Sequence, residues 1–70
     1  MRYVIIIERA GDNYSAYSPD IPGCGATGET IEEVTKEIHE AIRFHLDGLR
    51  AEGMPIPAPT SVVDFIEIAA

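Results

Sequence analysis

The stretch TIEEVTKEIHEAIRFHLDGLRAEGMP, residues 30–55, decides the fold because it carries the start and stop signals of one long helix. Thr30 and Glu33 form a capping box, in which the Thr30 hydroxyl accepts from the Glu33 amide while Glu33 reaches back to the Thr30 amide. Gly53 is typical of the left-handed residue after a helix, and the proline two residues later blocks continuation. The sequence therefore predicts a helix over residues 31–52.

At 100° per residue, this helix has one apolar face and one charged face. The apolar positions are Ile31, Val34, Ile38, Ala41, Ile42, Leu46 and Leu49. His45 falls among them, which favours an interior histidine with polar partners over a metal ligand. Phe44 falls outside them, beside acidic residues. An exposed aromatic there is either covered by the terminal segment or offered to another chain, so Phe44 is a candidate oligomer contact.

The residues before the helix predict three short strands. Residues 2–8 and 14–18 have strand composition, and the five residues between them have turn chemistry, as in an antiparallel hairpin. Two prolines in residues 19–23 indicate an ordered loop. Residues 24–28 are small enough for a third strand in a crowded place.

The residues after the helix predict a strap and a last strand. Residues 54–59 hold prolines at alternate positions, which indicates a stiff, extended segment. Residues 61–68 are expected to form an edge or subunit-pairing strand, with Val63 and Phe65 as candidate oligomer contacts. The whole is an α+β fold of order β-β-β-α-β, with one long helix packed on a small antiparallel sheet. We expect residues 1–70 to form a single domain.

Length and cysteine count predict self-association. A chain of 70 residues buries only about 60% of its unfolded surface and needs an added source of stability. Its single cysteine excludes an internal disulfide framework, so we expect a homo-oligomer, either a dimer or a tetramer. The longest apolar run, residues 3–7, is too short for a membrane span or a signal peptide. The expected location is therefore the cytoplasm, with no membrane contact.

The charge balance bears on partners. The sequence contains twelve acidic and five basic residues, which gives a formal net charge of −7. Such a surface repels phosphate backbones, so direct nucleic-acid binding is disfavoured. It favours a basic protein partner, because opposite fields speed encounter. The plainer alternative is that acidity only keeps a small protein soluble.

Candidate catalytic residues do not assemble into a site. Glu8 and Asp20 lie near strand ends, but two carboxylates without a third ligand make a poor Mg²⁺ site. Cys24 has no neighbouring cation in sequence to lower its pKa, and a free cysteine usually behaves as a small hydrophobe. His39 and His45 project about 120° apart on the helix and cannot share a metal there. We therefore expect neither a catalytic residue, a metal nor a cofactor, and expect that the protein is not an enzyme.

A longer pattern resembles a known family. YSAYSPDIPGCGATGETIEE, residues 14–33, resembles the signature of HicB-type antitoxins, which runs Y-x-A, then P-D-x-P-G-C, then A-x-G-x-T-x-x-E before the helix. GMPIPAP, residues 53–59, resembles the proline strap of the same family. The resemblance to the family covers essentially the whole chain.

The resemblance implies a partial ribonuclease-H-like fold that has lost its catalytic acids. It also implies a partner, a small basic HicA-type toxin that cleaves mRNA and whose catalytic histidine and RNA surface the antitoxin covers. Many relatives continue into a helix-turn-helix or ribbon-helix-helix domain that binds the operator. Here the sequence stops two residues after the last predicted strand, so this is a short form that we do not expect to bind an operator alone.

The leading hypothesis is therefore a non-enzymatic inhibitor of a HicA-like toxin. The residues expected near the partner are Glu8, Asp20, Pro22, Gly23 and Cys24. For the loop residues the alternative is maintenance of the fold, because proline and glycine have sufficient backbone reasons to be there. The alternative functions are an orphan oligomeric protein-interaction module and a vestigial metal-dependent ribonuclease.

Overall fold

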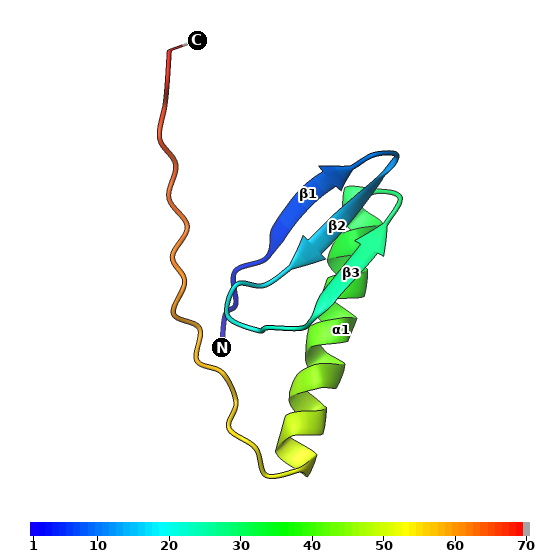
Figure 1. Cartoon of the computed structure of the whole chain (residues 1–70), viewed down its shortest axis with the longest axis vertical. Coiled ribbons are helices and arrows are strands. Elements are labelled where there is room, and N and C mark those ends of the chain that lie inside the picture. Colours follow the sequence, from blue (N-terminus) through cyan, green and yellow to red (C-terminus); the bar gives the residue numbers. More distant parts are fainter. Residues whose placement is uncertain (70) are drawn as a thin grey trace.

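The computed structural model describes residues 1–69 as a small antiparallel sheet followed by one helix. Strands β1 (Ile6–Ala10), β2 (Asn13–Tyr17) and β3 (Gly25–Gly28) lie in the order β1-β2-β3. Helix α1 (Ile31–Ala51) follows and lies against the sheet (Figure 1). The predicted α+β class is confirmed, with the element order β-β-β-α.

The hairpin is tighter than its sequence suggested. The β1–β2 ladder runs from the Ile6–Tyr17 pair to the Ala10–Asn13 pair, and Gly11 takes a positive φ of 65° in the turn. Strand β1 therefore starts four residues later and ends two residues later than predicted. Residues before Ile6 have no strand partner within the described chain, because β2 ends at Tyr17 and the proline-rich loop begins there.

Both ends of α1 follow the predicted capping chemistry with one correction. The Glu33 amide donates to the Thr30 hydroxyl at 3.0 Å, as expected for a capping box. The Glu33 carboxylate, however, accepts from the Glu29 amide at 3.1 Å rather than from the Thr30 amide. At the other end Gly53 has φ 68°, and the Met54 amide donates to the Leu49 carbonyl at 2.9 Å. The helix thus ends one residue before the predicted boundary.

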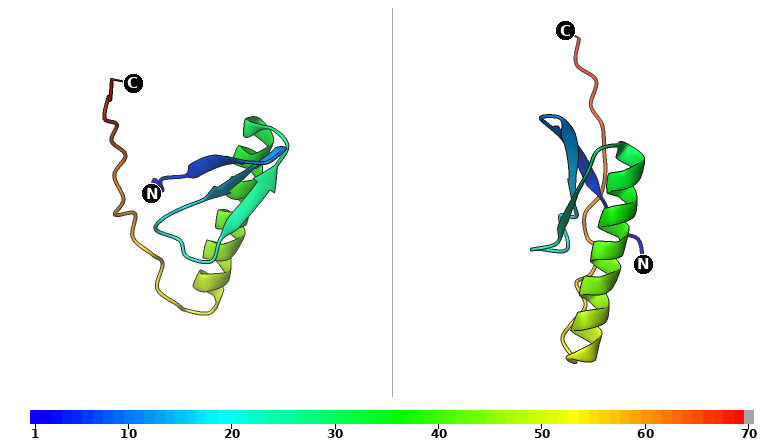
Figure 2. Two further views of the ribbon diagram at one scale, coloured as in Figure 1. Left: turned by 45° about the horizontal axis from the view of Figure 1, so that its top comes forward. Right: turned by 90° about the vertical axis from the view of Figure 1, so that its right-hand side faces the viewer.

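The core lies between α1 and one face of the sheet. Its buried side chains are Ala16, Ile21, Val34, Ile38, Ile42 and Leu46. Figure 2 shows the helix on a single side of the sheet, so the other face has no covering layer. Helix α1 packs mainly against β3 and β2 and only slightly against β1. This offset leaves the N-terminal end of the β1 side thinly covered.

The predicted last strand over residues 61–68 is not formed within the described part of the chain. This segment is extended but has no strand partner, and it runs away from the sheet (Figure 1). Ser61 is held at Asp20, and the described residues beyond it make no hydrogen bond to the body, although Val62 and Val63 line a pocket with residues 2–5. The prediction β-β-β-α-β was therefore wrong in its last element. Within residues 1–69 no helix combines the length and apolar character needed to cross a bilayer.

Candidate partner-binding surface

The loop between β2 and β3 is an ordered structure with an exposed tip. Ile21 is only 1% exposed and anchors the loop in the core, while its amide donates to the Ser18 carbonyl at 3.2 Å. Pro22 and Gly23 lie at the exposed tip, where Gly23 takes a positive φ of 78°. A non-glycine residue would be strained there, so the fold alone gives a reason for this glycine.

Asp20 ties this loop to the strap that follows α1. Its carboxylate accepts from the Thr60 and Ser61 amides at 3.2 and 3.0 Å and from both hydroxyls at 3.0 Å. The Ser61 amide is the main cause that lowers the pKa of Asp20 below its ordinary value, with the other hydrogen bonds adding to it. Sequence reasoning missed Thr60 and Ser61, because partners 40 residues away carry no local signal. Asp20 is therefore placed to hold the strap.

Cys24 is half-buried directly before β3. Burial raises the pKa of its thiol, so the group stays protonated at neutral pH. A protonated thiol is a poor nucleophile. This environment agrees with the expectation of a small semi-buried apolar residue.

Gly23 and Cys24 open onto a groove, which we call the loop groove, between the loop and the second half of α1. Its volume is about 460 Å³. The groove is lined by Gly23, Cys24, Gly25, Ala41, Phe44, His45, Gly48, Leu49 and Glu52. Three of these residues are glycines, which leave backbone accessible. The structure therefore brings two of the predicted partner-binding residues together with Phe44.

Phe44 is the most conspicuous side chain of the loop groove. It is 83% exposed, so the terminal segment does not cover it. Glu40 precedes Phe44 by one helical turn, and Glu37 precedes Ala41 by one turn, so acidic residues extend from the groove along α1. An exposed aromatic flanked by carboxylates combines a hydrophobic anchor with a negative rim, an arrangement typical of protein docking sites.

The remaining predicted site residues lie elsewhere. Glu8 is exposed on the uncovered face of the sheet, opposite Ser15, which pairs in turn with Thr27. The structure therefore does not join Glu8 to the loop groove. Val63 and Phe65 lie in the extended C-terminal segment and are 55% and 86% exposed.

The histidines and acids are dispersed over the molecule. His45 lines the loop groove, whereas His39 lies in a different pocket beside the N-terminus. Within residues 1–69, no three histidine, cysteine or acidic side chains gather closely enough to hold a metal ion.

The sheet, the single helix and the acidic groove define a small α+β protein with a candidate docking surface. The family described as "HicB_like antitoxin of bacterial toxin-antitoxin system" matches residues 3–69, and the chain belongs to this family. The suspected resemblance is thereby confirmed.

Relatives occur in a phage and in bacteria. An "uncharacterized 14.9 kDa protein in rep-hol intergenic region" of Haemophilus phage HP1 is 35% identical over 94% of this chain, which spans 50% of the phage protein. A UPF0150 protein of Synechocystis is 34% identical, with 94% of this chain and 85% of the relative covered. A UPF0150 protein of Helicobacter pylori is 35% identical, with 91% and 90% covered. No solved structure matches the chain.

Proposed function

We propose that the protein is an antitoxin that binds and neutralises a small basic HicA-type mRNA-cleaving toxin without itself catalysing a reaction. Membership of the HicB-like antitoxin family supports a role in a toxin–antitoxin system. The net charge of −7 supports a basic partner and argues against direct binding to nucleic acid. Because such a toxin acts on mRNA, the proposal places the complex in the cytoplasm.

The observation that carries the proposal is the exposed Phe44 at the acidic end of the loop groove. A large aromatic in water is unfavourable unless another surface covers it, and aromatic anchors provide much of the affinity at protein interfaces. Glu37 and Glu40 add negative charge beside it. A surface evolved to hold RNA phosphates would meet these carboxylates with favourable charge complementarity.

The loop supplies the other wall of the docking surface in this proposal. Pro22, Gly23 and Cys24 contact the toxin, and Asp20 acts indirectly by fixing the loop against the strap. Glu8 is a separate contact on the open sheet face, too far along the fold to share the loop groove. Its contribution is therefore tested separately.

The direct test uses the product of an adjacent small basic reading frame. The toxin alone is expected to cleave RNA, and stoichiometric addition of this chain is expected to stop cleavage. Undiminished cleavage at saturating chain would overturn the proposal. Metal-dependent cleavage by this chain alone would instead support the vestigial ribonuclease.

Four variants test which surface binds the toxin. Phe44→Ala and Glu37→Lys are each expected to weaken toxin binding by about 30-fold or more, the loss typical of an interface hot spot. Asp12→Lys, in the β1–β2 turn, is the matched control because it changes the net charge by the same amount as Glu37→Lys. Equal losses of toxin affinity for Glu37→Lys and Asp12→Lys would contradict the proposal that the toxin binds at the loop groove. Glu8→Lys reports on the open sheet face.

A further inference from the structure

Helix α1 has a second face, beside the core face, that the rest of the described chain does not bury. At 100° per residue, a sector of about 80° holds five positions there, the last of them the C-cap residue. They recur at intervals of four, three, four and four residues, which is the spacing of a helix contact stripe. We call them the outer stripe: Glu37, Ala41, Phe44, Gly48 and Glu52. Ala41 is half-buried and the others are exposed, and all except Glu37 line the loop groove.

Gly48 is the glycine for which the fold of the single chain gives no reason. Its φ is not positive, and a Cβ built on it would meet nothing within 4 Å. Every other glycine either takes a positive φ or would bring a Cβ within 3.4 Å of a backbone atom: Gly11, Gly23 and Gly53 in the first group, Gly25 and Gly28 in the second. A glycine inside a helix lowers stability relative to alanine. The remaining use of such a residue is the close approach of another molecule to the helix backbone.

The outer stripe has an apolar centre and a carboxylate at each end. In the centre, Phe44 is 83% exposed and lies one helical turn before the gap left by Gly48. Glu37 and Glu52 lie at the ends, about 22 Å apart at the rise of an α-helix. Within residues 1–69 neither carboxylate has an ion pair. The stripe therefore suits a surface that is apolar in the middle and basic at both ends.

The pattern favours a helix over other occupants. An extended segment binds by pairing with a strand edge, but among the described residues that line the loop groove only Gly25 belongs to a strand. A helix presents side chains every three or four residues, as the stripe does, and can approach closely where Gly48 leaves the backbone accessible. A second copy of this chain would set the carboxylates of Glu37 and Glu52 against each other, which is unfavourable.

We propose that a helix of the basic partner packs along the outer stripe, with its backbone closest to α1 at Gly48 and basic residues facing Glu37 and Glu52. Phe44 packs beside that helix, and Gly48 determines how near it comes. The glycine makes the free chain less stable and the complex tighter. This inference rests on the proposed function and names the element of the toxin that the loop groove receives.

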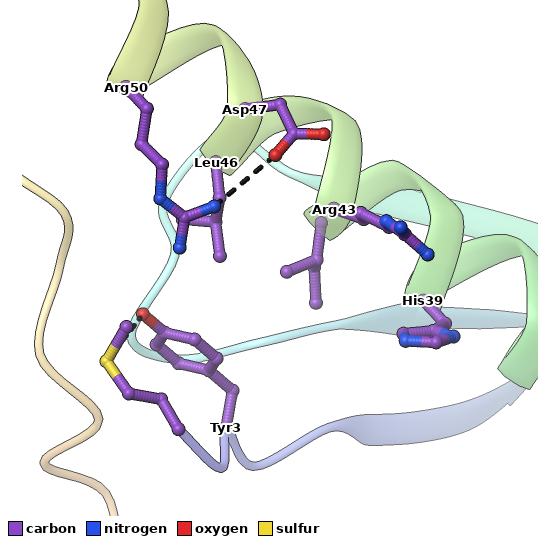
Figure 3. A pocket seen from close by; sticks show the side chains of 8 residues that line it. Tyr3, His39, Arg43, Leu46, Asp47 and Arg50 are labelled. Atoms are coloured by element: carbon purple, nitrogen blue, oxygen red, sulfur yellow. Dashed lines mark hydrogen bonds and ion pairs between the residues drawn. The ribbon is translucent and has the colours of Figure 1, made fainter. Parts of the chain in front are cut away.

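Gly48→Gln is the first test. Glutamine is a good helix former, so urea unfolding is expected to show no loss of stability in this variant. The added side chain should block the closest approach and raise the Kd for the product of the adjacent basic reading frame by about tenfold or more. His39→Gln is the matched control, because it places the same side chain on the other side of α1, in the pocket of Figure 3. It should leave the toxin affinity unchanged.

The outcomes separate this inference from the proposed function. If the wild-type chain binds the toxin and Gly48→Gln binds it equally well, the helix contact is overturned while the antitoxin role stands. If the wild-type chain does not bind the toxin, the proposed function fails and this inference fails with it. A lower mass of the free Gly48→Gln chain in sedimentation would show that a second copy occupies the outer stripe, and it would also overturn the inference.

Cross-saturation NMR identifies the conformation of the bound segment. Isotope-labelled toxin is saturated with the unlabelled wild-type chain or with Gly48→Gln, and the toxin residues whose signals differ between the two complexes are located in its sequence. Residues that recur every three or four positions support a helix on the outer stripe. Residues at alternate positions would show an extended segment and overturn the inference.

Discussion

At the scale of single residues, Asp20 is the junction that joins two segments distant in sequence. Four hydrogen bonds to Thr60 and Ser61 stabilise its charged form, which lowers its pKa. A carboxyl whose folded pKa is depressed contributes stability above its unfolded pKa, and this contribution is lost as pH falls through the folded value. The anchor should therefore persist at neutral pH and open only in acid.

The pH dependence can be followed directly by NMR. We expect the amide resonances of Thr60 and Ser61 to titrate with a midpoint below 3.8, the ordinary value for this carboxyl. Asp20→Asn is expected to abolish this titration and to release the strap. A midpoint at or above 3.8 would show that the hydrogen bonds do not hold in solution.

Cys24 gives a second prediction at this scale. Because burial raises the pKa of its thiol, alkylation by iodoacetamide at pH 7–8 should be slower than that of a free thiol such as glutathione. The rate should rise toward the free-thiol rate when the protein is unfolded in urea. Faster labelling of the native protein than of the unfolded chain would indicate an activated thiol.

At the scale of elements, β3 and α1 approach each other closely at Gly28. A Cβ added at Gly28 would lie 2.7 Å from the backbone nitrogen of Val34 and 3.0 Å from its Cα. These backbone atoms cannot rotate away from the new methyl group as a side chain could. Gly28→Ala should therefore push α1 from the sheet and destabilise the protein by about 1–3 kcal/mol.

Gly48→Ala is the matched control for this substitution. Nothing lies within 4 Å of the Cβ position at this helical glycine. Removing glycine from a helix interior should stabilise the protein by about 0.5–1 kcal/mol. Urea unfolding of both variants gives the comparison, and equal changes in the midpoint would contradict the close approach at Gly28.

The elements also show what a sequence can predict. The helix was predicted to within one residue, because Thr30, Glu33 and Gly53 act through bonds to near neighbours. The last strand was predicted wrongly. Sequence composition predicts an extended backbone, but it does not predict whether a sheet edge lies beside that backbone to pair with it. Residues 61–68 are extended as expected, yet they pair with no strand in the described part of the chain.

The candidate site was likewise predictable from the sequence in some features and not in others. Helical periodicity placed Phe44 outside the core, and the structure finds it exposed. Periodicity gave no sign that Gly23 and Cys24 would share a groove with it, since that depends on how β3 packs on α1. Asp20 was predicted to lie near the partner because it is close to Gly23 and Cys24 in sequence. Its hydrogen bonds, however, are to Thr60 and Ser61, directly after the strap.

At the scale of the whole molecule, charge is divided between two sides of α1. Glu37 and Glu40 lie on the side of the loop groove, whereas Arg43 and Arg50, together with Asp47, line a pocket beside the N-terminal segment (Figure 3). The carboxylates of Glu37 and Glu40 have no ion pair within residues 1–69, so this side of the helix is the one that we propose meets a basic partner.

The net charge of −7 leads to a prediction about association kinetics. Opposite fields accelerate encounter with a basic toxin, and salt screens them as the Debye length falls from about 30 Å at 10 mM to about 8 Å at physiological ionic strength. The association rate constant should therefore fall about tenfold over this range, with a much smaller change in the dissociation rate constant. Stopped-flow mixing of the two proteins measures both constants.

In the same stopped-flow experiment, Phe44→Ala distinguishes electrostatic steering during association from apolar contact in the formed complex. It removes apolar contact without changing charge, so it should raise the dissociation rate constant and leave the salt dependence of association unchanged. Glu37→Lys should instead flatten that salt dependence, because it removes negative charge beside the loop groove. Association that is insensitive to salt, or a Phe44→Ala effect confined to the association rate, would mean that complex formation depends on neither this charge nor this aromatic anchor.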